Sequence, residues 1–151
     1  MIVFRLAKSD YATDLSGKGA QLYGGRWNNK GIPLLYTCQS RALCLVEVAV
    51  HLPLGLLPKD YLLITIEIPD DEQVESVLTD CLPANWKSFP PIHATQNLGD
   101  TFVKEGKWLV LKVPSVVVQG EYNYLINPMH PRFERIRIVE SEPFAFDERM
   151  F

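Results

Sequence analysis

The amino-acid sequence predicts an α+β fold in which short strands are interspersed with a few helices. Two observations support this class. Apolar runs of strand length end at prolines, and two longer segments have the composition and the end signals of helices. The chain has 151 residues, of which 47% are hydrophobic, and it contains no internal repeat, low-complexity tract or linker. Because this length supports one hydrophobic core, we expect a single domain over residues 1–151.

Five apolar or alternating runs have the composition of short strands. These runs are Ile2–Leu6, Leu34–Thr37, Leu62–Ile68, Trp108–Val113 and Arg135–Val139. The third and fourth runs end at Pro69 and Pro114, because proline cannot donate to a sheet ladder. Val116–Val118 is a candidate to resume the fourth strand after Ser115. In the last run charged and apolar residues alternate, which predicts a half-exposed strand.

Two segments are predicted to be helices. Ser40 is a good N-cap for the helix "RALCLVEVAVHL" at residues 41–52, which Pro53 terminates. A second helix is expected within residues 93–105, closed by Gly106. Residues 17–31 are rich in glycine, and we expect them to be irregular apart from a short hairpin. The acidic segment that follows Pro69 has no clear period.

The distribution of charge indicates a small anionic ligand. The chain has a net charge of −3 and a pI near 5.6, which argues against a nucleic-acid-binding protein. Residues 15–59 nevertheless carry a positive net charge, because this segment contains several basic residues and only one acidic residue, Glu47. The basic residues are Lys18, Arg26, Lys30, Arg41 and Lys59. A local anion site is therefore consistent with the sequence.

The remaining bulk features indicate a reduced, cytoplasmic protein without a membrane partner. No apolar run approaches the roughly 18 residues of a membrane span, and no signal-type stretch follows Arg5 and Lys8. The cysteines Cys38, Cys44 and Cys81 are odd in number and contain no C-x-x-C pair, which favours free thiols over disulfides. A metal site of the zinc-finger type is excluded on the same ground.

The stretch "GGRWNNKG" at residues 24–31 allows two interpretations. In the first it is a hairpin whose tip, at residues 29–31, tolerates positive φ. In the second, Arg26 presents its guanidinium fork to a phosphate or carboxylate beside backbone that glycine keeps flexible. The two interpretations are compatible with each other.

Glu47 is an unusual residue, because it lies on a helix that we expect to be mostly buried. One explanation is an ion pair with His51 one turn later. A metal site formed by Cys44, Glu47 and His51 is geometrically feasible, although it mixes ligand types and matches no known motif. The functional interpretation makes Glu47 the only acid at the mouth of a basic cleft, where it could act in glycosidic chemistry. Ser115, considered alone, is explained as a turn hydroxyl.

Four segments together resemble the RES family, which is named for an arginine, a glutamate and a serine. They are "GGRWNNKGIPLLYT", "ALCLVEVAVHL", "LVLKVPSVVV" and "NYLINPMHP". The resemblance implies a fold similar to ADP-ribosyltransferase toxins. It also implies a toxin of a bacterial toxin–antitoxin pair that depletes NAD, with an Xre-type helix-turn-helix antitoxin as its partner in a hetero-oligomer. On this resemblance the site residues are Arg26, Glu47 and Ser115, together with Tyr36.

The chemistry of NAD cleavage suits these residues. Positive charge develops on the ribose as neutral nicotinamide leaves, and Glu47 is expected to stabilise it. Arg26 would bind the pyrophosphate, Tyr36 would offer its ring to nicotinamide, and Ser115 would contact a phosphate or a ribose. No G-x-G-x-x-G motif is present, so NAD is expected as substrate, with no cofactor and no metal.

The sequence leaves three acceptors open for the ADP-ribosyl group: water, phosphate and a protein. A glycohydrolase, a phosphorylase and a protein ADP-ribosyltransferase share the same first bond cleavage. Two further alternatives stay open, a module that binds a nucleotide without catalysis and a pure interaction protein.

Overall fold

The structure is a computed structural model that describes residues 1–151 and contains a seven-stranded sheet. The strands are β1 (Ile2–Lys8), β2 (Leu35–Cys38), β3 (Tyr61–Glu67), β4 (Val74–Ser76), β5 (Val110–Pro114), β6 (Tyr122–Ile126) and β7 (Arg137–Phe144). Their order in the sheet is β4-β5-β6-β2-β1-β3-β7, and every pairing is antiparallel except β4 with β5.

Four α-helices and three short 3-10 helices complete the fold. The α-helices are α1 (Ser9–Ala12), α2 (Lys18–Tyr23), α3 (Arg41–Ala49) and α4 (His93–Glu105). The 3-10 helices are η1 (Thr79–Cys81), η2 (Pro131–Arg135) and η3 (Glu148–Met150). No helix of the structure combines the length and the apolarity that crossing a membrane requires.

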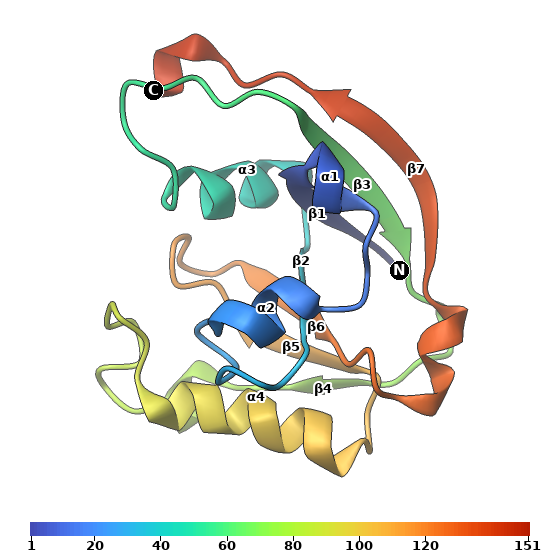
Figure 1. The fold of residues 1–151 in the computed structure, drawn as a ribbon. Helices are drawn as coiled ribbons and strands as arrows, with labels where there is room; N and C mark the ends of the chain where they lie inside the picture. Colours follow the sequence, from blue (N-terminus) through green and yellow to red (C-terminus); the bar gives the residue numbers. More distant parts are fainter.

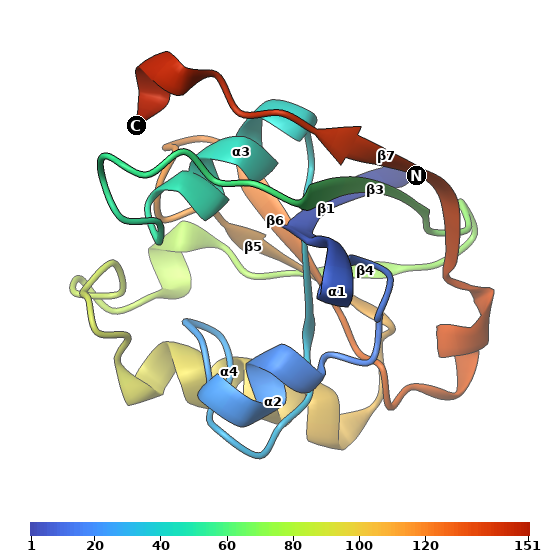
Figure 2. The same ribbon diagram turned by 45° about the horizontal axis from the view of Figure 1, so that its top comes forward.

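The sheet consists of two halves with a narrow junction between them. In one half, β1 pairs with β3 along its full length and β3 pairs with β7. In the other, β6 lies between β2 and β5. Only the pair Phe4 and Cys38 joins β1 to β2. Figures 1 and 2 show α3 on the side of β1, β3 and β7, whereas α4 lies on the opposite side of the molecule, next to α2.

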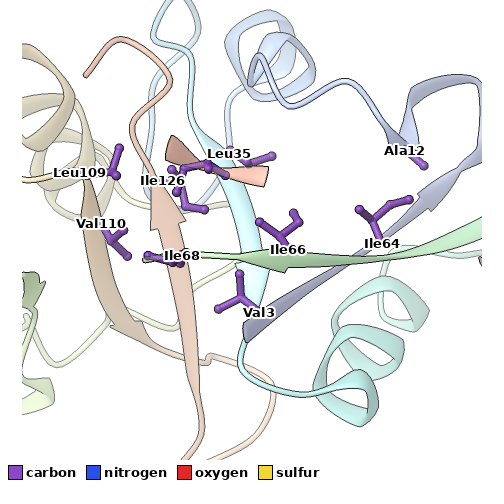
Figure 3. Close-up of a cluster of buried hydrophobic side chains, with 10 residues drawn as sticks. Val3, Ala12, Leu35, Ile64, Ile66, Ile68, Leu109, Val110 and Ile126 are labelled. Atoms are coloured by element: carbon purple, nitrogen blue, oxygen red, sulfur yellow. The ribbon is translucent and has the colours of Figure 1, made fainter. Parts of the chain in front are cut away.

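The hydrophobic core follows this division. The largest cluster fills the space between the two halves, with Val3 and Ile66 from one half near Leu35 and Ile126 from the other, while Ile64 lies beside Ala12 (Figure 3). Separate clusters lie under α4 and under α3. Because each helix has a core of its own, side chains between the helices are free to form a site.

Several elements confirm the sequence-based predictions. The expected strands at the two ends of the chain, and those near residues 34, 62 and 108, are present, although β7 begins two residues and ends five residues later than predicted. Helix α4 spans residues 93–105 and ends at Gly106 in the left-handed conformation, as predicted. Ser40 caps α3, because its side chain accepts a hydrogen bond from Leu43 N at 3.1 Å.

Other predictions were wrong. Helix α2 lies in the segment predicted to be irregular, and Gly17 and Gly24 flank it with positive φ. Residues 116–118 form bends and do not resume β5, while β6 was not predicted. The hairpin of residues 24–31 exists only as a bridge between Gly25 and Asn28. Its tip is therefore Arg26 and Trp27, not residues 29–31.

Helix α3 is shorter and more exposed than expected. It ends at Ala49, three residues before the predicted end. Only Leu43 and Cys44 are buried among its residues, and Val50, which follows it, is 56% exposed, although the sequence predicted a mostly buried helix. One side of α3 therefore faces open space and not core. Glu47 is half-buried, on the same helix.

Candidate active site

A cavity of about 1140 Å³ lies between α3, the turn of residues 24–27 and the segment of residues 87–91. Its volume exceeds the roughly 300–1,000 Å³ of typical ligand sites, so it has room for a dinucleotide. Glu47 is the only acidic residue that lines it. The basic residues on its wall are Arg5, Lys8, Arg26 and Lys87. Of these, only Arg26 belongs to the positive segment that the sequence indicated.

The Glu47 carboxylate is held through one of its oxygens. Its Oε1 accepts a hydrogen bond from Ser115 Oγ at 2.7 Å and another from Asn123 Nδ2 at 2.7 Å. Its Oε2 accepts no hydrogen bond from the protein. The ion pair with His51, one alternative that the sequence left open, is absent, because the Glu47 carboxylate is directed to Ser115 and Asn123 and not along its own helix. A neutral anchor leaves the negative charge of Glu47 available to a ligand.

Ser115 is a buried link between the backbone and Glu47. Its side-chain oxygen accepts hydrogen bonds from Val117 N at 3.1 Å and Val118 N at 3.0 Å, while its proton goes to Glu47. Ser115 is 2% exposed and does not line the cavity, although Val116 and Val117 do. These contacts differ from the predicted contact with a phosphate or a ribose. Ser115 is directed to the carboxylate instead.

Arg26 lies at the tip of its turn, and only part of its guanidinium group is hydrogen-bonded within the protein. Its Nη1 donates to the carbonyl oxygens of Trp86 at 2.8 Å and Ser88 at 2.9 Å. Its Nε and Nη2 make no hydrogen bond within the protein, and no carboxylate forms a salt bridge with it. Burial lowers the pKa of Arg26 from its ordinary value, while the Glu47 charge acts in the opposite direction.

Close packing against α4 fixes the turn that carries Arg26. A Cβ on Gly99 of α4 would collide with the carbonyl oxygen of Trp27, so only glycine permits this approach. Asp100 accepts hydrogen bonds from Asn29 N at 2.9 Å and Asn29 Nδ2 at 2.7 Å. Gln96 Nε2 donates to the carbonyl of Gly25 at 3.1 Å. The asparagines and glycines of the motif thus hold a rigid turn.

Tyr36 supports the same turn from β2. Its hydroxyl accepts from Trp27 N at 3.0 Å and donates to Asn28 Oδ1 at 2.7 Å. Burial raises the pKa of Tyr36, so the phenol stays neutral. The residue lines the cavity, and its hydroxyl is already occupied. Only the ring is therefore left for a ligand.

Two residues of the site were missed by the sequence analysis. Arg5 lines the cavity from β1; its Nη2 donates to Tyr11 O at 3.1 Å, while its buried Nε has no partner. Burial lowers the pKa of Arg5. Asn123 contacts Glu47 from β6, a strand that was not predicted. The charge within a strand-like run, "IVFRLAK", was the available signal for Arg5.

The structure brings no group of His, Cys, Asp and Glu side chains together in a way that could hold a metal ion. Cys44 and Glu47 do line the cavity with His51, so these residues are close without forming a ligand set. Cys38 and Cys44 are free thiols, and the contact with Cys44 together with burial raises the pKa of Cys38. The Cys38 thiol therefore lacks the properties of an activated nucleophile.

Comparison with known proteins identifies the family. Residues 2–147 match the model of the RES domain. The chain belongs to the RES domain family. The RES domain here is 38% identical over 146 residues to the Prs ADP-ribosylating toxin of Sphingobium sp., an alignment that covers 95% of this chain and 91% of that protein. It is 37% identical over 152 residues to Toxin Res of Photorhabdus laumondii, with 99% and 97% covered.

The fold also resembles a solved structure. The crystal structure of the M. tuberculosis MbcT-MbcA toxin-antitoxin complex contains a chain that superposes on this RES domain with a TM-score of 0.76 and 22% sequence identity. The match covers 95% of this chain and 84% of that chain. The α+β fold class that the sequence predicts is confirmed, with short strands in one sheet and a few interspersed helices.

Proposed function

We propose that this RES domain is the toxin of a toxin–antitoxin pair and that it uses NAD as its substrate, cleaving the bond between nicotinamide and ribose. The names of its relatives support the toxin assignment. The observation that supports NAD cleavage is the geometry of Glu47. One oxygen of its carboxylate is hydrogen-bonded and the other is free, and Glu47 is the only acid in a basic cavity.

Glu47 is the residue that acts on the reacting ribose. Nicotinamide departs as a neutral base, so no proton has to be delivered to it. The ribose gains positive charge as the bond breaks, and the free Oε2 of Glu47 would stabilise that charge or hold a ribose hydroxyl. Ser115 keeps the carboxylate in place and is a positioning residue, a change from the substrate contact that the sequence suggested.

Arg26 and Arg5 are proposed to bind the pyrophosphate. Every other arginine of the chain forms a salt bridge with a carboxylate. Arg5 and Arg26 form none, and both line the cavity. Free N–H donors on two partly buried guanidinium groups suit the two negative charges of a pyrophosphate. The ring of Tyr36 remains the proposed platform for nicotinamide.

The proposed partner is an Xre-type helix-turn-helix antitoxin that forms a hetero-oligomer with this chain. The support for a protein partner is the M. tuberculosis MbcT-MbcA structure, which is a toxin-antitoxin complex. NAD is a metabolite of the cell interior, so the proposed reaction would occur in the cytoplasm.

The acceptor of the ADP-ribosyl group separates two versions of this function. Water or phosphate as acceptor makes the protein a glycohydrolase or a phosphorylase. The name of the Sphingobium relative favours a second candidate, transfer to a protein. Both versions require the same attack on the nicotinamide–ribose bond and the same role for Glu47.

The deciding experiment measures nicotinamide released from NAD by the wild-type protein and by Glu47→Gln, with and without phosphate. Gln retains an oxygen that can accept from Ser115 and Asn123, so the variant should fold. We expect its rate to fall by about 10²–10³-fold, the usual effect of removing one transition-state charge partner. The matched control is Glu105→Gln, on the exposed end of α4 and outside the cavity, which should keep the wild-type rate.

Full turnover in Glu47→Gln would remove this residue from the mechanism. Saturable NAD binding without nicotinamide release would instead support a binding module. A rate that depends on phosphate identifies a phosphorylase. Growth arrest on expression of the chain alone, relieved by a neighbouring gene, tests the toxin assignment separately from the chemistry.

A further inference from the structure

We propose that Asn123 is a second positioning residue of the reaction, and that it acts with Ser115 to fix the plane of the Glu47 carboxylate so that only Oε2 faces the substrate. This inference rests on the proposed function for the reaction itself. The contact that it describes can be tested without any turnover.

The position of Asn123 makes it a rigid donor. The residue lies in β6 and is paired with Cys38 of β2 on one side and with Val113 of β5 on the other. Residues paired in register present their side chains on the same face of a sheet, and Cys38 and Asn123 both line the cavity. A side chain on the middle strand of three has little freedom to move. Its Nδ2 is 2.7 Å from Glu47 Oε1.

The unpaired Oδ1 of Asn123 indicates that its NH₂ group, and not its carbonyl oxygen, has the functional role. Its Oδ1 is buried and accepts no hydrogen bond from the protein. An unpaired buried carbonyl oxygen destabilises the folded state, and an apolar side chain of the same size would avoid this cost. The cost is therefore explained by a need for the NH₂ group that faces Glu47.

Two donors on one oxygen have a geometric consequence that one donor lacks. A single hydrogen bond from Ser115 would allow the carboxylate of Glu47 to rotate about its side-chain torsions, because χ3 of glutamate is broad. Ser115 approaches from the loop after β5 and Asn123 from β6, so together they restrict this rotation. Both donors are neutral, and the carboxylate keeps its charge for the ribose.

The test compares two replacements of Asn123 across pH. Asn123→Ala removes the donor, and we expect nicotinamide release to fall on the order of 10²-fold, as for a small misplacement of a reacting group. KM for NAD should change little, because Asn123 acts through Glu47. The titratable groups that line the cavity with Glu47 include Arg26, Cys38, Cys44 and His51, and all of them are unchanged in every variant compared.

Asn123→Asp is nearly isosteric and should respond to pH in the opposite way. Two adjacent carboxyl groups share a proton as the pH falls, and the protonated one again donates to its neighbour. The rate of Asn123→Asp relative to wild type should therefore rise toward low pH. The relative rate of Asn123→Ala should not. Relative rates that are independent of pH in both variants would overturn the proposal, because a purely structural amide predicts that result.

A matched control and an independent readout complete the experiment. Asn127, just after β6, is also buried and donates to Val103 O at 3.2 Å, away from Glu47. Asn127→Ala should lower the melting temperature and leave the pH profile of the remaining activity unchanged. The side-chain amide protons of Asn123 should give an NMR signal that shifts in Glu47→Gln. An unshifted signal would overturn the contact, even if wild type releases no nicotinamide and the proposed function fails.

Discussion

Glu72 and Glu47 are two acidic residues whose surroundings differ in one decisive respect. The Glu72 side chain is 1% exposed and is surrounded by cations, with Arg132 Nε at 3.0 Å and Arg135 Nη1 at 2.6 Å. Glu47 has only neutral donors, Ser115 and Asn123, at hydrogen-bond distance. The two arginines that line its cavity, Arg5 and Arg26, form no salt bridge with a carboxylate, although the Asp14 charge acts on Arg5.

This difference distinguishes the charged residues around Glu72, which stabilise the fold, from those of the cavity, which are available to bind a ligand. Around Glu72 the charges compensate one another, so the cluster connects the segment before β4 to η2 and needs nothing from outside. In the cavity, Arg5 and Arg26 stay apart from Glu47, and desolvation of unpaired charge destabilises the free protein. An anionic ligand would supply the missing compensation. The two regions should therefore respond to mutation with opposite signs.

The largest effect on stability is expected for Glu72→Gln. Removing this charge leaves Arg132 and Arg135 without their common partner. The free energy of unfolding should fall by about 2 kcal/mol, less than the ~3–5 kcal/mol of a fully buried pair, because the two arginine side chains are 49% and 35% exposed. Urea denaturation measures this loss, and nicotinamide release per folded molecule should stay at the wild-type value.

Glu140→Gln is the matched control, since Glu140 is 55% exposed and lies 3.9 Å from Arg41. Its loss of stability should be a fraction of that of Glu72→Gln. Equal losses in the two variants, or a lower rate of nicotinamide release in Glu72→Gln, would contradict the distinction between the two regions.

Arg5→Met should show the opposite sign. Met fills similar space without a buried charge, so we expect the free protein to gain about 1 kcal/mol of stability, within the usual range for such changes. KM for NAD should rise about 10- to 100-fold, because a charge-assisted hydrogen bond contributes ~1.5–3 kcal/mol. Thermal unfolding without ligand and initial-rate kinetics provide the two measurements.

The control for this prediction is Arg137→Met, which removes an exposed arginine paired with Glu67 at 2.7 Å. That variant should show neither the gain in stability nor the change in KM. If Arg5→Met were less stable than wild type and bound NAD normally, Arg5 would be a structural residue.

The sequence predicts the parts of this molecule that depend on local signals. Ser40 and Gly106 mark helix ends because capping is decided within one turn, and both predictions are confirmed. Helix α2 was missed because its six residues lie between glycines, which normally indicate irregular backbone. Strand β6 was missed because "YNYLI" contains Asn123, which faces the cavity and Glu47, an environment that no local pattern reveals.

The sequence singled out Arg26, Tyr36 and Glu47, which the structure places at the cavity, but it did not predict their contacts. Glu47 and Arg26 stood out because charge on an apolar helix or between glycines is unusual. The direction of the Glu47 carboxylate depends on Ser115 and Asn123, 68 and 76 residues away in sequence. The sequence also gives no sign that Arg5 lacks a salt bridge, because the residues around a side chain are known only when the whole chain has folded.

The smallest effect is expected for Arg41→Ala, which tests whether pairing or proximity decides the role of an arginine. Arg41 begins α3, the helix that carries Glu47, and it forms ion pairs with Glu140 and Glu142. Its side chain is 50% exposed, so we expect a loss of about 0.5 kcal/mol that shrinks with added salt. KM for NAD should not change. A higher KM would mean that a neutralised surface charge still acts on the cavity, and the lack of an acidic partner would then no longer distinguish the ligand-binding arginines from the structural ones.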